Sequence, residues 1–119
     1  MKKNSKLSTI ITVGALLSGG LAAGSVHAGD DAAKIWDTNC AACHGKDGKG
    51  KTMMGRKLDI KDLTDAKVQA AFDDAQATKD IKEGVTEKGV EKMKAYGDKF
   101  SDDEIKGLVA HVRSFKPVP

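Results

Sequence analysis

The chain has 119 residues, which is enough for one small domain. Its formal net charge is +3, and three lysines within the first six residues account for all of it, so the rest of the chain is formally neutral. No strip of aromatic and basic residues suggests base stacking either, and the sequence therefore gives no reason to expect a nucleic-acid partner.

The first 28 residues have the pattern of a secretory signal peptide. A basic start ending at Lys6 precedes an uncharged, mostly apolar stretch over residues 7–23, and Val26 and Ala28 put small residues before a cleavage site. The alternative is an uncleaved membrane anchor, but this stretch is diluted by serine and threonine and is shorter than the roughly 20 residues that a span requires. We expect cleavage after Ala28, export to the periplasm or an equivalent space, and a mature domain at 29–119 with no stable membrane insertion.

The mature chain predicts an all-α domain of about four helices, because helical spacing dominates and no stretch alternates like a strand. Asp30 or Asp31 is expected to cap a first helix that runs to about Asn39. Four glycines and several lysines then mark residues 44–57 as a loop.

Two shorter helices are expected in the middle of the chain. Thr64 is the expected N-cap of the first, whose apolar stripe consists of Val68, Ala71, Phe72 and Ala75. The second lies around residues 79–83 and stops at Gly84. Further glycines at positions 89 and 97 indicate that residues 85–100 are largely loop.

The last helix has the clearest start, because Ser101 and Glu104 form a capping-box pattern. Pro117 is expected to end it, and its apolar face consists of Ile105, Leu108, Val109, Val112 and Phe115. The mature domain has only one Trp, one Tyr and three Phe, a thin supply of large apolar side chains. A cofactor or a covalent link is therefore expected to complete its core.

The segment Cys40-Ala41-Ala42-Cys43-His44 has the Cys-x-x-Cys-His pattern of covalent haem attachment. Two thioethers must reach two vinyl groups on one side of a porphyrin, and the short turn between the cysteines presents both sulfurs together. The next residue is carried over the iron, where an imidazole nitrogen can bind. We therefore expect one haem c, attached through Cys40 and Cys43, with His44 as an axial ligand of its iron.

Other interpretations of the two cysteines explain less. A disulfide accounts for both cysteines but not for the adjacent His44, and a thioredoxin-like redox pair requires a βαβ setting that this sequence lacks. A structural zinc site needs about four ligands, and the mature chain offers only Cys40, Cys43, His44 and His111 as cysteine or histidine ligands.

The chain resembles the small class I cytochrome c family over nearly all of residues 30–119. Trp36 stands four residues before the first cysteine, and residues 39–45 are similar to the family's attachment segment. Residues 81–84, 93–97 and 100–112 are similar to its short helix, its methionine loop and its final helix. The resemblance implies a cytochrome c-like domain packed around one haem, with crossed N- and C-terminal helices, His/Met ligation and electron transfer.

The second axial ligand has four candidates in the mature chain: Met53, Met54, Met93 and His111. Met53 and Met54 lie in the loop that is expected to wrap the proximal side of the haem. Met93 comes much later, so the chain can pass round to the distal face, and the family resemblance also places the ligand there. We expect Met93 to bind the iron and His111 to pack against Trp36, where the two terminal helices cross.

Two positions depart from the family pattern. Arg56 stands where the family often has proline, in a region that supplies a carbonyl to the proximal imidazole, and the expected acceptor is the backbone of Gly55 or Arg56. Lys94 stands where a proline commonly follows the ligand methionine. A more mobile methionine loop is therefore expected.

One-electron cycling of iron is the function that these residues predict, with no catalytic residue and no enzyme activity, because both axial positions are filled by protein. The leading hypothesis is a soluble, monomeric electron shuttle. Two alternatives remain open. One is a haem-based sensor or gas-binding protein in which Met93 is displaced, and the other is an electron-transfer subunit of a redox enzyme.

Charge is unevenly placed along the mature chain. Residues 44–57 carry five basic and one acidic side chain, residues 88–99 carry four and two, and residues 59–87 carry four and eight. If His44 and Met93 are the ligands, both positive segments border the haem. We expect them to steer redox partners that have an acidic docking surface, although lysines that merely solvate glycine-rich loops are the alternative.

Overall fold

The computed structural model describes Gly14 and residues 28–115. In this part of the chain the elements are α1 (Ala28–Asn39), α2 (Ala41–His44), α3 (Met53–Lys57), α4 (Ala66–Ala70), α5 (Asp74–Glu83), β1 (Val85–Glu87), β2 (Val90–Met93) and α6 (Asp102–Ser114). The predicted helical domain is confirmed, with a small sheet added to it.

The expected signal peptide up to residue 27 lies outside the described residues, apart from Gly14, and so does Pro117. No helix of the described part has the length and apolar character needed to cross a bilayer.

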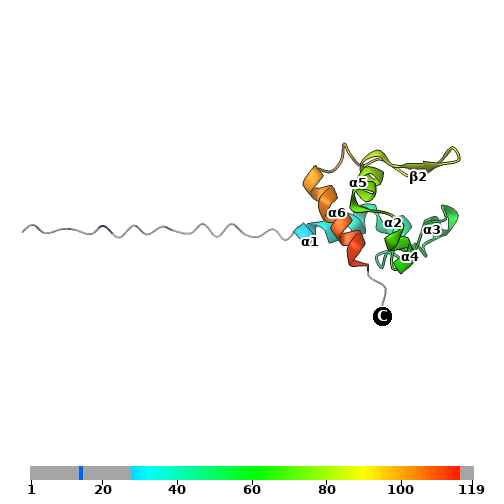
Figure 1. The fold of residues 1–119 in the computed structure, drawn as a ribbon, viewed down its shortest axis with the longest axis horizontal. Coiled ribbons are helices and arrows are strands. Elements are labelled where there is room, and N and C mark those ends of the chain that lie inside the picture. Colours follow the sequence, from blue (N-terminus) through cyan, green and yellow to red (C-terminus); the bar gives the residue numbers. More distant parts are fainter. Residues whose placement is uncertain (1–13, 15–27, 116–119) are drawn as a thin grey trace, which may run out of the picture.

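The first and last helices cross, and α1 packs more extensively on α6 than on any other element (Figure 1). At the crossing, the ring of Trp36 lies 5.3 Å from that of His111 and 5.1 Å from that of Phe115, measured between centroids. The crossed terminal helices and the packing of His111 against Trp36 are therefore as predicted.

The helix α6 supplies much of the core. Ser101 caps it by accepting from the Glu104 amide at 3.2 Å, and the Glu104 carboxylate accepts from the Ser101 amide at 2.8 Å, so the predicted capping box is confirmed. Leu108 and Val112 are buried in one cluster with Trp36 from α1. Burying each such aliphatic side chain contributes about 1.5–3 kcal/mol to stability.

The N-caps in the middle of the chain differ from the prediction. Thr64 does not cap a helix, because its amide and hydroxyl both donate to the carboxylate of Asp62. Asp65 caps α4 instead, and Asp73 caps α5, which therefore begins well before residue 79. A carboxylate is a strong acceptor for free helix amides, and here two aspartates occupy these positions. The end of α5 at Gly84, with φ of 78°, is as predicted.

Two stretches predicted as loops contain regular structure. Residues 44–57 end in the short helix α3, and residues 85–100 contain an antiparallel hairpin in which Val85 pairs with Met93. Its turn places Lys88 and Gly89 at φ of 51° and 78°, the left-handed conformation that two-residue hairpin turns need. At the start of α1, Asp30 and Asp31 lie inside the first turn rather than ahead of it.

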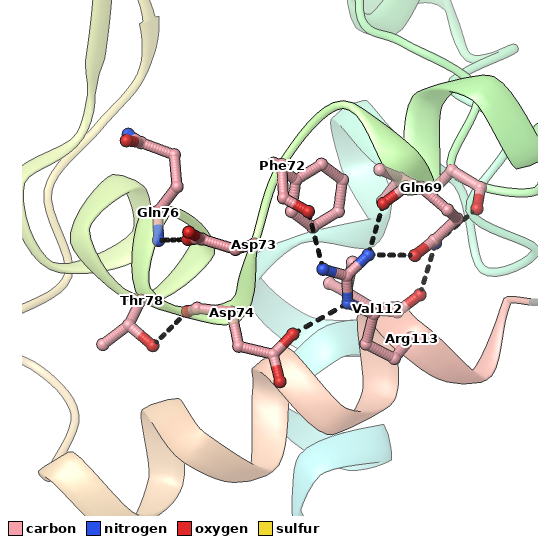
Figure 2. Close-up of polar contacts among 9 residues, drawn as sticks. Gln69, Phe72, Asp73, Asp74, Gln76, Thr78, Val112 and Arg113 are labelled. Atoms are coloured by element: carbon pink, nitrogen blue, oxygen red, sulfur yellow. Dashed lines mark hydrogen bonds and ion pairs between the residues drawn. The ribbon is translucent and has the colours of Figure 1, made fainter.

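Arg113 near the end of α6 ties that helix to the junction between α4 and α5 (Figure 2). Its guanidinium donates to the carbonyls of Gln69 at 2.6 Å and Phe72 at 2.7 Å, and to the Asp74 carboxylate at 2.8 Å. The side-chain Nε2 of Gln69 donates in turn to the Val112 carbonyl at 2.9 Å. Because Phe72 and Val112 also line an apolar cavity of about 330 Å³, this cluster fixes one wall of that cavity.

Candidate haem-binding site

Residues 40–44, which carry the Cys-x-x-Cys-His motif, form a single helical turn, the attachment turn, directly after α1. The Cys40 amide donates to the Trp36 carbonyl at 2.8 Å, and the His44 amide donates to the Cys40 carbonyl at 2.9 Å. Residues three and four apart share a face of a helix, so the turn brings Cys40, Cys43 and His44 together. Both cysteines are half-buried, and no disulfide joins them.

Two side chains hold this turn from outside. The indole Nε1 of Trp36 donates to the Gly45 carbonyl at 2.9 Å in a buried hydrogen bond. The Thr52 hydroxyl donates to the Cys43 carbonyl at 2.8 Å and also caps α3 by accepting from the Gly55 amide at 2.9 Å. Sequence reasoning missed Thr52, although a threonine three residues before Gly55 is a helix-capping signal.

The turn opens onto two adjoining cavities of about 330 and 380 Å³. Cys40, His44, Met93 and Tyr96 line both of them, whereas Cys43 lines the second. The first is walled mainly by apolar side chains of the core, among them Leu63, Val68, Phe72, Ile81 and Leu108. Volumes of this order are typical of cofactor sites, and the apolar walls suit a porphyrin face.

The four candidates for the second axial ligand lie in different surroundings. Met93, at the end of β2, is half-buried and lines both cavities together with His44. Met53 is 85% exposed and lines neither cavity, and Met54 is 41% exposed and lines only the second. His111 packs on Trp36 and lines neither. Among the four, Met93 is therefore the one that shares both cavities with His44.

Burial lowers the pKa of His44, so its imidazole is neutral at pH 7, the form that binds metals. Burial, reinforced by the neighbouring Cys43, raises the pKa of Cys40 to about 11, so its thiol stays protonated. The donors are thus two thiols, a neutral imidazole and a thioether beside apolar walls, and they fit a c-type haem. No group of three or more His, Cys, Asp or Glu side chains in the described residues has the arrangement of a metal-ion site, as structural zinc would require.

The imidazole of His44 lacks the hydrogen bond that the sequence predicts. His44 Nδ1 is buried and has no hydrogen-bond partner within the described part of the chain. The Gly55 carbonyl accepts from the Ile60 amide at 2.8 Å, and the Arg56 carbonyl accepts from the Asp59 amide at 3.3 Å. The hydrogen bond expected from His44 to the carbonyl of Gly55 or Arg56 is therefore absent from the described residues.

The crossed helices and the Cys-x-x-Cys-His turn facing an apolar cavity define the class of protein as a c-type cytochrome. Comparison with known proteins agrees and is more specific. Residues 27–112 match the model of the family described as "Cytochrome C oxidase, cbb3-type, subunit III", and the chain belongs to that family. Electron transfer is the general function of this class, and membership implies haem c with its iron as cofactor.

Similar proteins include a curated sequence and solved structures. The chain is 36% identical over 95 residues to the cbb3-type cytochrome c oxidase subunit FixP of Azorhizobium caulinodans, a match that covers 80% of this chain but 30% of that protein. The structure of the KustC0563 c-type cytochrome is similar with a TM-score of 0.63 and 33% identity, covering 72% of this chain and 98% of the other. A tyrosine-to-phenylalanine variant of that protein gives 0.64 and 35%, covering 72% and 99%. These likenesses support the cytochrome c-like fold.

Proposed function

We propose that this chain is an exported one-electron carrier in which Cys40 and Cys43 attach one haem covalently and His44 and Met93 bind its iron. When bound, the haem supplies reversible exchange of one electron between Fe(III) and Fe(II). The chain's own residues orient the group and exclude water from it. A thioether ligand such as Met93 favours Fe(II) more than a second imidazole would, and with both axial positions filled no enzyme activity is proposed.

The observation that carries this proposal is the shared lining of the two cavities. His44 from α2 and Met93 from β2 line the same apolar space, although Met93 lies 49 residues after His44 in the sequence (93 − 44). The other methionines of the mature chain lie at the rim or outside it, with Met53 85% exposed.

The proposed location is the periplasm or an equivalent compartment outside the cytoplasm. The support is the sequence pattern of the first 28 residues, with a basic start, an apolar stretch and a cleavage motif ending at Ala28. N-terminal sequencing of the purified protein should begin at Gly29. A chain that retains residues 7–23 in the membrane fraction would contradict export with cleavage.

The proposed partners are redox proteins with acidic docking surfaces. The second cavity is lined by Met54 from the positive segment 44–57 and by residues 91–94 from the positive segment 88–99. Lys49, Lys51, Arg56 and Lys57 are exposed, and none of them forms an ion pair within the described residues. Met53, Met54 and Val90 are the large apolar side chains exposed in the described part. Exposed basic side chains in a segment that also exposes Met53 and Met54 favour an acidic partner.

A second candidate function is that of an electron-transfer subunit or partner of a cytochrome c oxidase. The family description and the relative FixP, which is named as a subunit of a cbb3-type cytochrome c oxidase, favour it. The match covers only 30% of the length of FixP, so the activity and assembly of that whole protein are not carried over to this chain. A stable complex with a cytochrome c oxidase, isolated from the source cell by tagging this chain, would favour this candidate over the freely diffusing shuttle.

The ligation is tested by the weak sulfur-to-iron charge-transfer band that methionine-ligated ferric haem shows in the far red. Met93→Ala should abolish this band. Met54→Ala, in a methionine that lines only the second cavity, is the matched control and should retain it. Loss of the band in Met54→Ala but not in Met93→Ala would show that the wrong methionine has been assigned. Rapid carbon monoxide binding by the reduced wild type would favour the sensor instead.

A further inference from the structure

The segment that follows Met93 is tied to the attachment turn through Tyr96. The Tyr96 hydroxyl donates at 3.1 Å to the carbonyl of Asn39, the residue immediately before Cys40. The ring is buried, with 8% of the residue exposed, and stacks on Phe100 with centroids 5.5 Å apart and planes 16° apart. Tyr96 also lines both cavities. Its hydrogen bond therefore links, beside the cavities, the attachment turn that carries His44 to the segment that follows Met93.

Asn39 receives a second bond from the same segment. The Lys99 ammonium donates to the Asn39 side-chain oxygen at 2.7 Å, and the Asn39 amide nitrogen donates to the Ile35 carbonyl at 3.0 Å. The backbone and the side chain of Asn39 therefore both accept from residues that follow Met93. Of these two bonds, the one from Tyr96 is the better shielded, because Lys99 is exposed.

On its other side, the methionine segment rests on the end of α5. The Tyr96 amide donates to the Ile81 carbonyl at 2.9 Å, and the Gly97 amide donates to the Lys82 carbonyl at 3.1 Å. Gly84 permits the close approach, because a Cβ there would lie 2.6 Å from the Met93 carbonyl oxygen. These bonds fix the segment to α5, whereas the bonds to Asn39 fix it to the attachment turn.

We propose that Tyr96 is a positioning residue for Met93, and that its hydroxyl, bound to Asn39, limits how far Met93 can move relative to His44. The inference rests on the proposed ligation by Met93. The chain has Lys94 directly after the methionine, where no ring restricts the backbone. The Tyr96–Asn39 bond supplies a restraint at this point from outside the segment. Its loss should make displacement of Met93 by an added ligand roughly fivefold easier, the change that one hydrogen bond typically brings.

The test uses the haem-loaded, oxidised protein and added imidazole, with the far-red band as the readout. Tyr96→Phe keeps the ring packing and removes only the hydroxyl. The imidazole concentration at half displacement should fall roughly fivefold, with an unchanged far-UV circular dichroism spectrum. Lys94→Pro in the Tyr96→Phe background should restore the wild-type value, because Met93 ends a β-strand and so has the extended backbone that a residue before proline adopts.

Ser114→Ala is the matched control, since it removes another hydroxyl that donates to a backbone carbonyl, that of His111 at the far end of α6. It should leave imidazole binding unchanged. Wild-type imidazole binding by Tyr96→Phe would overturn the proposal, and so would an equal shift in Ser114→Ala, which would indicate general loosening. A far-red band that survives Met93→Ala would instead refute the ligation, and the positioning role would fall with it.

Discussion

Gly55 lies so close to the backbone of Cys43 that a Cβ on Gly55 would stand 2.5 Å from the Cys43 carbonyl oxygen, and it would be closer still to the carbonyl of Gly50. The helix α3 therefore packs against the attachment turn backbone to backbone. Thr52 completes this contact, because its hydroxyl bonds both the Cys43 carbonyl and the Gly55 amide.

Gly55→Ala should consequently destabilise the protein. Backbone atoms cannot yield as a flexible side chain can, so α3 must move away from the turn, and we expect a loss of about 1–3 kcal/mol in the free energy of unfolding. Urea unfolding of the haem-loaded protein measures it. Gly29→Ala is the control, because a Cβ there meets nothing within 4 Å at the exposed start of α1. Equal stability of the two variants would show that the close contact does not matter.

Arg113 should contribute more through its bonds to carbonyls than through its ion pair. Arg113→Lys keeps the charge but loses the planar fork that reaches the carbonyls of Gln69 and Phe72, and it should cost about 1–3 kcal/mol of unfolding free energy. Asp74→Asn removes only an ion pair whose acidic partner is 72% exposed, and it should cost less than about 1 kcal/mol. Urea denaturation of both variants decides between the two contributions, and the opposite order would contradict this description.

Electron exchange with a physiological partner should slow as ionic strength rises from about 0.01 M to about 0.15 M. Salt screens the attraction between the positive segments 44–57 and 88–99 and an acidic partner. Lys49→Glu and Lys94→Glu should slow the exchange at low salt, as stopped-flow kinetics can show. Lys67→Glu, on α4 in the negative segment, reverses the same charge on an exposed residue and should matter less. A rate that stays flat or rises with salt would refute an acidic partner.

The parts of the fold that the sequence predicts are those with local signals. The capping box of Ser101 and Glu104 marks the start of α6, and the apolar spacing after it marks the buried face. The hairpin is different, since its strands have only three and four residues and its turn needs Lys88 in a left-handed conformation. Lys92 also bonds the Leu58 carbonyl at 3.0 Å, a contact between distant segments that no local pattern indicates.

In the candidate site too, some residues have a local sequence signal and others depend on contacts between distant segments. Cys40, Cys43 and His44 follow from a five-residue motif, and the sequence prediction of Met93 is consistent with its place in the cavities. The supporting contacts depend on tertiary structure, because Tyr96 and Asn39 are 57 residues apart. The acceptor of His44 also depends on tertiary structure: its Nδ1 has no partner in the described residues, while the carbonyls of Gly55 and Arg56 accept from amides of the turn after α3.

The central claim is covalent attachment of one haem through Cys40 and Cys43, and acid–acetone extraction followed by intact-protein mass measurement tests it most directly. The purified mature protein should retain its haem through extraction and show the mass of the chain beginning at Gly29 plus one haem. The variant with both Cys40→Ala and Cys43→Ala should lose it and should accumulate poorly, because the cavities beside the core would stay unfilled. Haem that extracts completely from the wild type, leaving two free thiols, would contradict the account.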